Sequence, residues 1–360
     1  MYGQAYDGMS EYRFLNFTIA FALTLMIGWS LAIGRNPLLP VIVAVIVVYI
    51  VSSASEALRK LPLARDLPAL ALNIFLLAGF GLVFLALALL VASTIDQIVS
   101  VAPTYQANIM ALISSVAKTA GIDQIPNWEQ IRKLVFNKID FGQVLIAILG
   151  SVTNIGTTSF LIIVYAAFLV KERIGFPDKL CAAFPEESEA SAIRQTIEEI
   201  NQKIGNYLAV KTAINIVLAF VSYIVLLAFG IDFAVFWALA IGLMNYIPYF
   251  GSLLGVALPV LVSMAQFATI STTALLAVVL TVAQMYVGNV LEPRLIGRQL
   301  NLSPFVVLLA LSVWTTLWGV QGAILAIPLT SVLVIIARGF ESTRFIAILM
   351  SNDVADKSDA

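Results

Sequence analysis

Residues 233–291 form a long stretch that contains no Asp, Glu, Lys or Arg. Crossing the hydrocarbon core of a bilayer, about 30 Å thick, takes roughly 20 predominantly apolar residues in a helix. The stretch is therefore long enough to cross a membrane more than twice. It predicts an integral membrane protein built from several helices, because a water-soluble fold rarely leaves a segment of this length without charge.

Composition supports this prediction and narrows the function. Hydrophobic residues make up 61% of the 360 residues and charged residues 11%, whereas soluble domains have roughly 45–50% and 25%. The net charge of −1 gives no basic surface for nucleic acid. Histidine is absent, which removes the commonest metal ligand and the zinc-protease and Ser-His catalytic motifs. We therefore expect no enzyme activity and no bound metal or cofactor.

The apolar runs predict an all-α, polytopic fold with about eight to nine apolar segments. The first run is about 20 residues long, which suits a membrane helix better than the apolar region of a signal peptide. Lys211 lies about one turn inside the fifth run, and we expect its long side chain to reach the membrane interface. The five runs of the N-terminal part are residues 14–33, 37–51, 69–94, 143–170 and 207–229.

Two amphipathic segments separate these runs. In residues 95–141 apolar positions share one helical face, and Pro126-Asn127 is expected to divide the segment into two helices. In residues 175–206, Pro185 marks a helix start, and Ile193, Ile197, Ile200 and Ile204 form an apolar stripe. Both segments are expected to lie against the membrane or a neighbouring subunit.

The short loops predict the orientation. Arg59, Lys60 and Arg65 follow the second run, and a further group of basic residues follows the fourth. Because cytoplasmic loops are enriched in Lys and Arg, a cytoplasmic N-terminus fits best. Residues 175–206 are then cytoplasmic, and residues 95–142 lie outside the cytoplasm.

The C-terminal half contains two interrupted helices. Residues 233–247 give about 22 Å of helix at 1.5 Å per residue, which is too short for a perpendicular crossing. Pro248, Gly251, Gly255 and Pro259 interrupt the next stretch. Residues 303–318 and 323–337 repeat the plan, joined through residues 319–322. Paired broken segments of this kind indicate a transporter binding site, and two ordinary tight helical hairpins are the alternative.

These residues resemble the motifs of the autoinducer-2 exporter family of bacterial membrane proteins. The resemblance implies a helical transporter of the bacterial cytoplasmic membrane, assembled as a homo-oligomer, expected to be a pentamer. Family members are associated with export of a furanone-type quorum-sensing signal, and some with monovalent cation/proton antiport. The motifs are Asn245-Tyr246-Ile247-Pro248-Tyr249-Phe250-Gly251 with Gly255 and Pro259, then Glu292-Pro293-Arg294-Leu295-Ile296-Gly297 with Leu302-Ser303-Pro304, and Gly319-Val320-Gln321-Gly322 with Ile327-Pro328.

The candidate site residues are concentrated around the first interruption. The amides there could hydrogen-bond a neutral polyhydroxylated solute, or they could join helices to each other. The tyrosines could line a cavity or belong to an interfacial aromatic belt. Glu292 and Arg294 are candidates for a gate or for coupling, with simple ion pairing at a helix end as the alternative. The predicted substrate-binding residues are Asn245, Tyr246, Pro248, Tyr249, Gly251, Gly255, Gln284 and Asn289.

The expected partners are a small-molecule solute, membrane lipid and further copies of the chain. A channel-like oligomer stays open as an alternative to a carrier. The predicted organisation is N-terminal membrane helices (1–94), extracytoplasmic amphipathic helices (95–142), a membrane helix (143–174), a cytoplasmic amphipathic helix (175–206), a C-terminal core with two broken hairpins (207–348) and a disordered tail (349–360).

Overall fold

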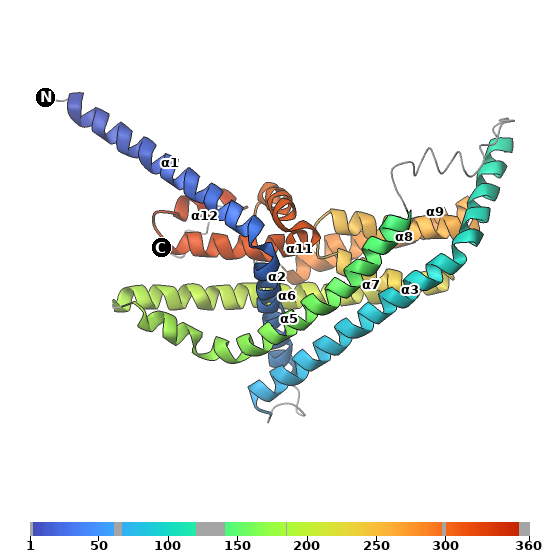
Figure 1. The fold of residues 1–360 in the computed structure, drawn as a ribbon, viewed down its shortest axis with the longest axis horizontal. Helices are drawn as coiled ribbons and strands as arrows, with labels where there is room; N and C mark the ends of the chain where they lie inside the picture. Colours follow the sequence, from blue (N-terminus) through green and yellow to red (C-terminus); the bar gives the residue numbers. More distant parts are fainter. Residues whose placement is uncertain (1–2, 61–66, 120–140, 185, 297–299, 353–360) are drawn as a thin grey trace.

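The computed structural model of the chain describes residues 3–60, 67–119, 141–184, 186–296 and 300–352 (Figure 1). These residues form helices joined by turns, with one isolated bridge between Leu302 and Ser351. Six helical stretches among them are long and apolar enough to cross a membrane, so the predicted all-α polytopic fold is confirmed. The helices are α1 (Gly3–Ile33), α2 (Arg35–Leu58), α3 (Ala69–Thr119), α5 (Phe141–Ala182), α6 (Glu187–Ala228), α7 (Ala234–Met244), α8 (Phe250–Phe267), α9 (Ile270–Tyr286), η1 (Val287–Leu291), α10 (Glu292–Ile296), α11 (Pro304–Gly339) and α12 (Arg344–Met350).

Helices α3 and α5 continue well beyond the ends of the predicted spans. Helix α3 runs past residue 94, through Pro103, as far as Thr119, so the first half of the amphipathic segment 95–141 extends a membrane helix. Helix α5 likewise runs past residue 170 through Pro177. The predicted amphipathic helix 175–206 is divided between the end of α5 and the start of α6. The predicted break at Pro126-Asn127 lies outside the described residues.

Helix α6 is the central element of the bundle. It contacts α2, α5, α7, α9, α10, η1 and α11, and it begins one residue after Glu186, close to the start predicted at Pro185. Its membrane half contributes Ile214, Leu218 and Leu226 to a buried apolar cluster. Residues Ile241 and Leu276 from α7 and α9 complete the same cluster, so the first interrupted region packs directly on α6.

Helices α7 and α8 form the first interruption as a tight hairpin. Helix α7 has 11 residues, fewer than the predicted arm, because Phe233 is left-handed at its start and Asn245 ends it. A Cβ atom at Gly251 would lie 1.7 Å from the carbonyl oxygen of Met244. Only glycine permits this close approach between the arms.

The second interruption lies inside α11, at Gly319, whose φ of 64° and ψ of −143° are not helical. The Nε1 of Trp314 donates to the Oγ1 of Thr330 at 3.0 Å. In a continuous helix these residues, 16 positions apart, would be separated by about 24 Å, so the chain folds back between them. Gly322 lies against the carbonyl of Trp314, where a Cβ would approach to 1.9 Å. The predicted interruption at residues 319–322 is confirmed.

The ends of the long helices point in different directions. The turn between α5 and α6 lies at the left of Figure 1, and the C-terminal end of α3 lies at the upper right. Residues 349–352, predicted as part of a disordered tail, end α12 and pair with the segment before α11 through Ser303 N to Met350 O and Asn352 N to Asn301 O. The remainder of that predicted tail lies outside the described residues.

Candidate functional site

Polar residues recur along the buried face of α6. Tyr207, Lys211 and Asn215 follow each other at intervals of four, which places them on one face of the helix. All three are buried, as is Ser222 farther along. A row of buried polar groups beside membrane helices needs partners, because unpaired polar groups are costly away from water. Asn215 has a partner in the first hairpin, and Lys211 has one in the segment after α9.

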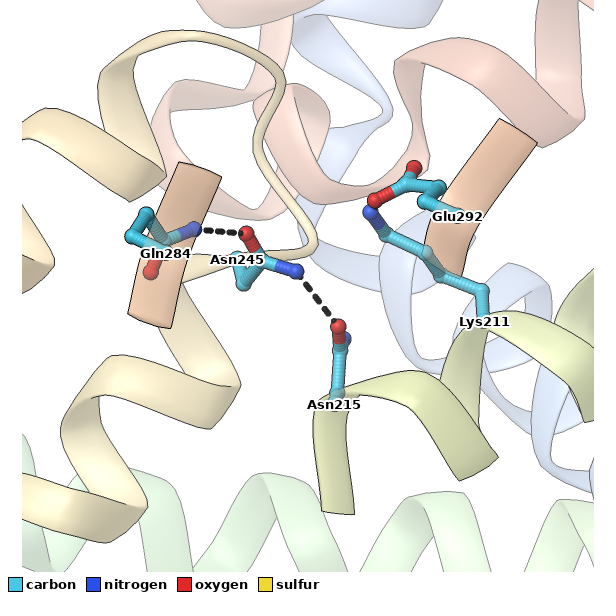
Figure 2. A network of polar contacts seen from close by, with 5 residues as sticks. All are labelled: Lys211, Asn215, Asn245, Gln284 and Glu292. Carbon is cyan, nitrogen blue, oxygen red and sulfur yellow. Dashed lines mark hydrogen bonds and ion pairs between the residues drawn. The ribbon is translucent and has the colours of Figure 1, made fainter. Parts of the chain in front are cut away.

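Three amides meet between α6, the hairpin loop and α9 (Figure 2). The Nδ2 of Asn245 donates to the Oδ1 of Asn215 at 2.8 Å, and the Nε2 of Gln284 donates to the Oδ1 of Asn245 at 2.8 Å. We call these three residues the amide cluster. All of them are buried. The Nδ2 of Asn215 makes no hydrogen bond of ordinary geometry, although the Asn215 amide faces the Tyr246 hydroxyl.

Tyr246 fixes the hairpin loop to α6. Its hydroxyl lies 2.7 Å from the Oγ1 of Thr212, and that Oγ1 also lies 2.7 Å from the carbonyl oxygen of Leu208. A threonine hydroxyl has a single proton, which the Leu208 carbonyl takes, so Tyr246 is the donor to Thr212. The loop is therefore held to one helical turn of α6 by Tyr246 and by the amide cluster together.

Lys211 forms an ion pair with Glu292, with 2.7 Å between Nζ and Oε1. The lysine side chain is 6% exposed and the glutamate side chain 27%. The prediction that Lys211 reaches the membrane interface is therefore wrong: the lysine points into the protein, where a carboxylate neutralises it. Glu292 is thus ion-paired, and among the described residues its partner is Lys211 of α6.

A π-helical turn, η1, precedes Glu292 directly. A π turn holds an additional residue compared with an α turn and is frequent at functional sites. It changes the rotational register between α9 and α10, and so sets the direction in which the Glu292 side chain leaves the helix. Lys211 and Asn215 are one turn apart on α6, about 6 Å along its axis. The ion pair and the amide cluster are thus neighbours on the same helix, as Figure 2 shows.

The other predicted residues lie outside this buried cluster. Asn289 and Arg294 are exposed, and Tyr249 is 57% exposed. Pro248 lies in the hairpin loop, where its carbonyl accepts from Phe250 N at 2.6 Å. The glycines were expected to leave room for a neighbouring backbone or a solute. At Gly251 the neighbour is the backbone of Met244, and at Gly255 a Cβ would lie 3.6 Å from Ile241.

Sequence reasoning missed two members of the site, Thr212 and Asn215, and misjudged Lys211. For Lys211 and Asn215 the signal was present in the spacing of polar residues 207, 211 and 215 along one predicted membrane helix. A single lysine near a helix end suggests a solvated side chain. Three polar residues on one face indicate instead a surface that packs against protein.

A second group of polar contacts fixes the far end of the hairpins. The Tyr105 hydroxyl donates to Asp232 at 2.7 Å, and the backbone N–H of Asp232 donates to the Oε1 of Gln266 at 2.9 Å. The Nδ2 of Asn108 donates to the carbonyl of Gln266 at 2.7 Å. The extension of α3 beyond residue 94 therefore attaches to the turns that flank α7 and α8.

A family model described as AI-2E family transporter matches residues 15–340 of the chain. The chain belongs to this family. It is therefore related to membrane transport proteins over nearly its whole length. Among its relatives is the AI-2 transport protein TqsA of Escherichia coli K12, which is 27% identical over 350 residues, 94% of this chain and 96% of TqsA.

Two further relatives match over shorter regions. A putative transport protein of Borreliella burgdorferi is 33% identical over 207 residues, which is 56% of this chain and 57% of that protein. The putative transport protein YhhT of Escherichia coli K12 is 35% identical over 129 residues, 36% of this chain and 37% of YhhT. The names of the relatives agree on transport, which is consistent with the expectation of a protein that is not an enzyme.

Proposed function

We propose that this AI-2E family transporter exports a small, neutral, polyhydroxylated solute across the bacterial cytoplasmic membrane, with a furanone-type quorum-sensing signal as the first candidate. The observation that carries the proposal is the buried amide cluster at the tip of the first hairpin. Amide groups both donate and accept hydrogen bonds, so they match hydroxyl groups without requiring a charge on the solute.

The cluster also has unused capacity. Asn215 Nδ2 is a buried donor without a hydrogen bond of ordinary geometry, and a solute hydroxyl could accept from it. Because the three amides come from α6, the hairpin loop and α9, a solute that exchanged their mutual hydrogen bonds for its own would loosen the hairpin from α6. The relative TqsA is named an AI-2 transport protein. A furanone-type signal with hydroxyl groups is compatible with hydrogen bonding to the three amides.

Glu292 is the proposed coupling residue, and the structure adds Lys211 as its partner. With no histidine and no acidic residue in residues 233–291, few other groups near the cluster can carry a proton. Opening of the Lys211 to Glu292 pair would release a carboxylate beside the cluster. We propose that the chain works as a homo-oligomer, a pentamer, with its N-terminus in the cytoplasm.

The test is flux in vesicles that contain the purified protein. Furanones, other small polyols and monovalent cations are offered in turn, with and without a pH gradient. Asn245→Leu and Gln284→Leu are compared with Asn289→Leu, an exposed amide outside the cluster. Loss of one hydrogen bond is worth about 0.5–1.5 kcal/mol, so half-saturation should rise roughly 2- to 10-fold in the first two variants only.

Three results would contradict the proposal. Saturable polyol flux that is unchanged in both cluster variants, with normal oligomer size, would remove the cluster from the pathway. Flux of cations without flux of any polyol would favour cation/proton antiport. Large ion conductance without saturation would indicate a channel.

A further inference from the structure

A pocket of about 260 Å³ lies between α2, α3 and α5, away from the amide cluster. Its volume is slightly below the roughly 300–1,000 Å³ typical of small-molecule sites, which suits a headgroup better than a whole ligand. Small side chains from the last turns of α2, including Ser52 and Ser55, leave the space, and the first two turns of α3 close one side. The charged and amide side chains that line it are Glu56, Arg59, Asn73 and Arg173.

The pocket carries an excess of positive charge. Arg59 and Arg173 contribute two guanidinium groups and Glu56 one carboxylate. Among the described residues, none of these three has an ion-pair partner within 4.0 Å. The Arg173 guanidinium lies 5.2 Å from the centre of the Tyr49 ring, a contact that restricts its position. Guanidinium groups with free donors are well suited to the oxygens of a phosphate.

One lining atom also lacks a donor. The Oδ1 of Asn73 is buried and has no hydrogen-bond partner. Buried polar atoms in folded proteins are nearly always paired, so an occupant that carries a hydroxyl group would complete this one. A ligand that matches the pocket therefore carries two groups, an anionic oxygen group that the arginines bind and a hydrogen-bond donor for Asn73.

The surface beside the pocket is apolar. Leu70 lines the pocket and is 43% exposed, and Ile74, one turn farther along the same side of α3, is 54% exposed. These residues belong to a helix that is long and apolar enough to cross the membrane. An occupant whose polar end enters the pocket would have its remaining part along this apolar face. That arrangement fits an amphiphile and does not fit a free polar solute.

We propose that this pocket binds the headgroup of an anionic glycerophospholipid, of the phosphatidylglycerol class, from the leaflet at the C-terminal end of α2. The phosphate diester contacts Arg59 and Arg173, and a headgroup hydroxyl donates to Asn73 Oδ1. The single negative charge of the lipid matches the excess of one positive charge in the pocket. A zwitterionic lipid would leave that charge unbalanced. The acyl chains lie along α3 beside Leu70 and Ile74.

The test measures lipid binding to the full-length protein by native mass spectrometry and by thermal stabilisation in detergent doped with lipid. Phosphatidylglycerol, phosphatidylethanolamine and phosphatidylcholine are compared at equal concentration. The variants are the double variant Arg59→Gln/Arg173→Gln and the single variant Asn73→Leu. Arg344→Gln is the matched control, because Arg344 is an exposed arginine far from the pocket on α12.

Binding of phosphatidylglycerol should be at least about ten-fold weaker in the double arginine variant, clearly weaker in Asn73→Leu, and unchanged in Arg344→Gln. The double variant should also lose the preference for phosphatidylglycerol over phosphatidylcholine. Equal binding of the three lipids by the unaltered protein would overturn the proposal, as would equal loss in the control. A preference for phosphatidylethanolamine would overturn the anionic assignment.

A second arm separates a lipid from a free anion. Inorganic phosphate and glycerol 3-phosphate are titrated in the absence of lipid. Stabilisation by these anions that matches the effect of phosphatidylglycerol, and that the arginine variant abolishes, would assign the pocket to a soluble phosphate compound and overturn the lipid assignment. Neither set of results depends on solute flux, so the outcome is independent of the proposed export function.

Discussion

The ion pair between Lys211 and Glu292 predicts an asymmetric response to mutation. Glu292→Gln leaves the lysine without a carboxylate in a position where only 6% of its side chain is exposed. Removing one partner of a buried ion pair costs about 3–5 kcal/mol, and we expect that range here. Lys211→Met leaves a carboxylate whose side chain is 27% exposed. Water can solvate it in part, so the expected cost is lower, about 1–3 kcal/mol.

The double variant Lys211→Met/Glu292→Gln should recover most of the loss, because it removes both charges and keeps side chains of similar volume. The assay is unfolding of the purified protein by SDS in mixed micelles, followed by the fluorescence of the five tryptophans. The two single losses sum to about 4–8 kcal/mol, so a double variant that loses only about 1 kcal/mol gives a coupling free energy of about 3–7 kcal/mol. Two equally stable single variants, or a double variant that is no better than their sum, would refute this account of the pair. The double variant also tests coupling, because it should fold yet lose dependence of flux on a pH gradient.

Two further predictions concern the hairpins and the orientation. Gly251→Ala should prevent normal assembly, because its Cβ would lie 1.7 Å from the Met244 carbonyl oxygen. Gly255→Ala should assemble normally, because its Cβ would lie 3.6 Å from Ile241. Oligomer size is the measurement, and equal behaviour of the two variants would contradict the hairpin geometry. Single cysteines that replace Lys118 and Glu198, in a chain with Cys181 replaced, should be labelled from opposite sides of the membrane. Labelling of both from the same side would contradict the predicted topology.

The membrane helices could be predicted because their signal is local. A run of apolar residues long enough to cross the bilayer specifies a helix without reference to any other part of the chain. The break at Gly319 was predictable because glycines separate two apolar runs that are each too short to cross the bilayer. Closely spaced glycines alone are not sufficient, since α3 continues through Gly79 and Gly81. Helix ends were harder: the apolar run of α3 ends near residue 94, but the helix continues to Thr119, because an amphipathic sequence is as helical as an apolar one.

The site was only partly predictable, because it depends on contacts between distant residues. Asn245 and Gln284 were found from their own rarity in an uncharged stretch. Asn215 was not, since nothing in the sequence near it indicates that the hairpin loop packs there. Lys211 was assigned to the interface because its partner, Glu292, is 81 residues away. A charge near a helix end can be judged only when the packing of its face is known.

The two hairpins use one structural device for different purposes. In each, a glycine after the reversal packs against a carbonyl oxygen of the first arm, Met244 for Gly251 and Trp314 for Gly322. The first hairpin then presents Asn245 and Tyr246 to polar groups of α6. The first arm of the second hairpin ends at Trp318, next to the break at Gly319. The Nε1 of Trp318 donates to the carbonyl of Leu31, and its side chain packs in an apolar cluster with Leu39.

Because the backbone device is the same, the difference between the hairpins must come from their tip residues. A polar tip facing a polar row on α6 can exchange its hydrogen bonds with a solute. Trp318 at the second tip instead has a backbone carbonyl of α1 as its hydrogen-bond partner and otherwise packs in an apolar cluster. The paired glycine pattern therefore identifies two hairpins but does not by itself identify two binding sites. The polar site follows from the coincidence of that pattern with residues 207, 211 and 215, which supply partners to the first hairpin.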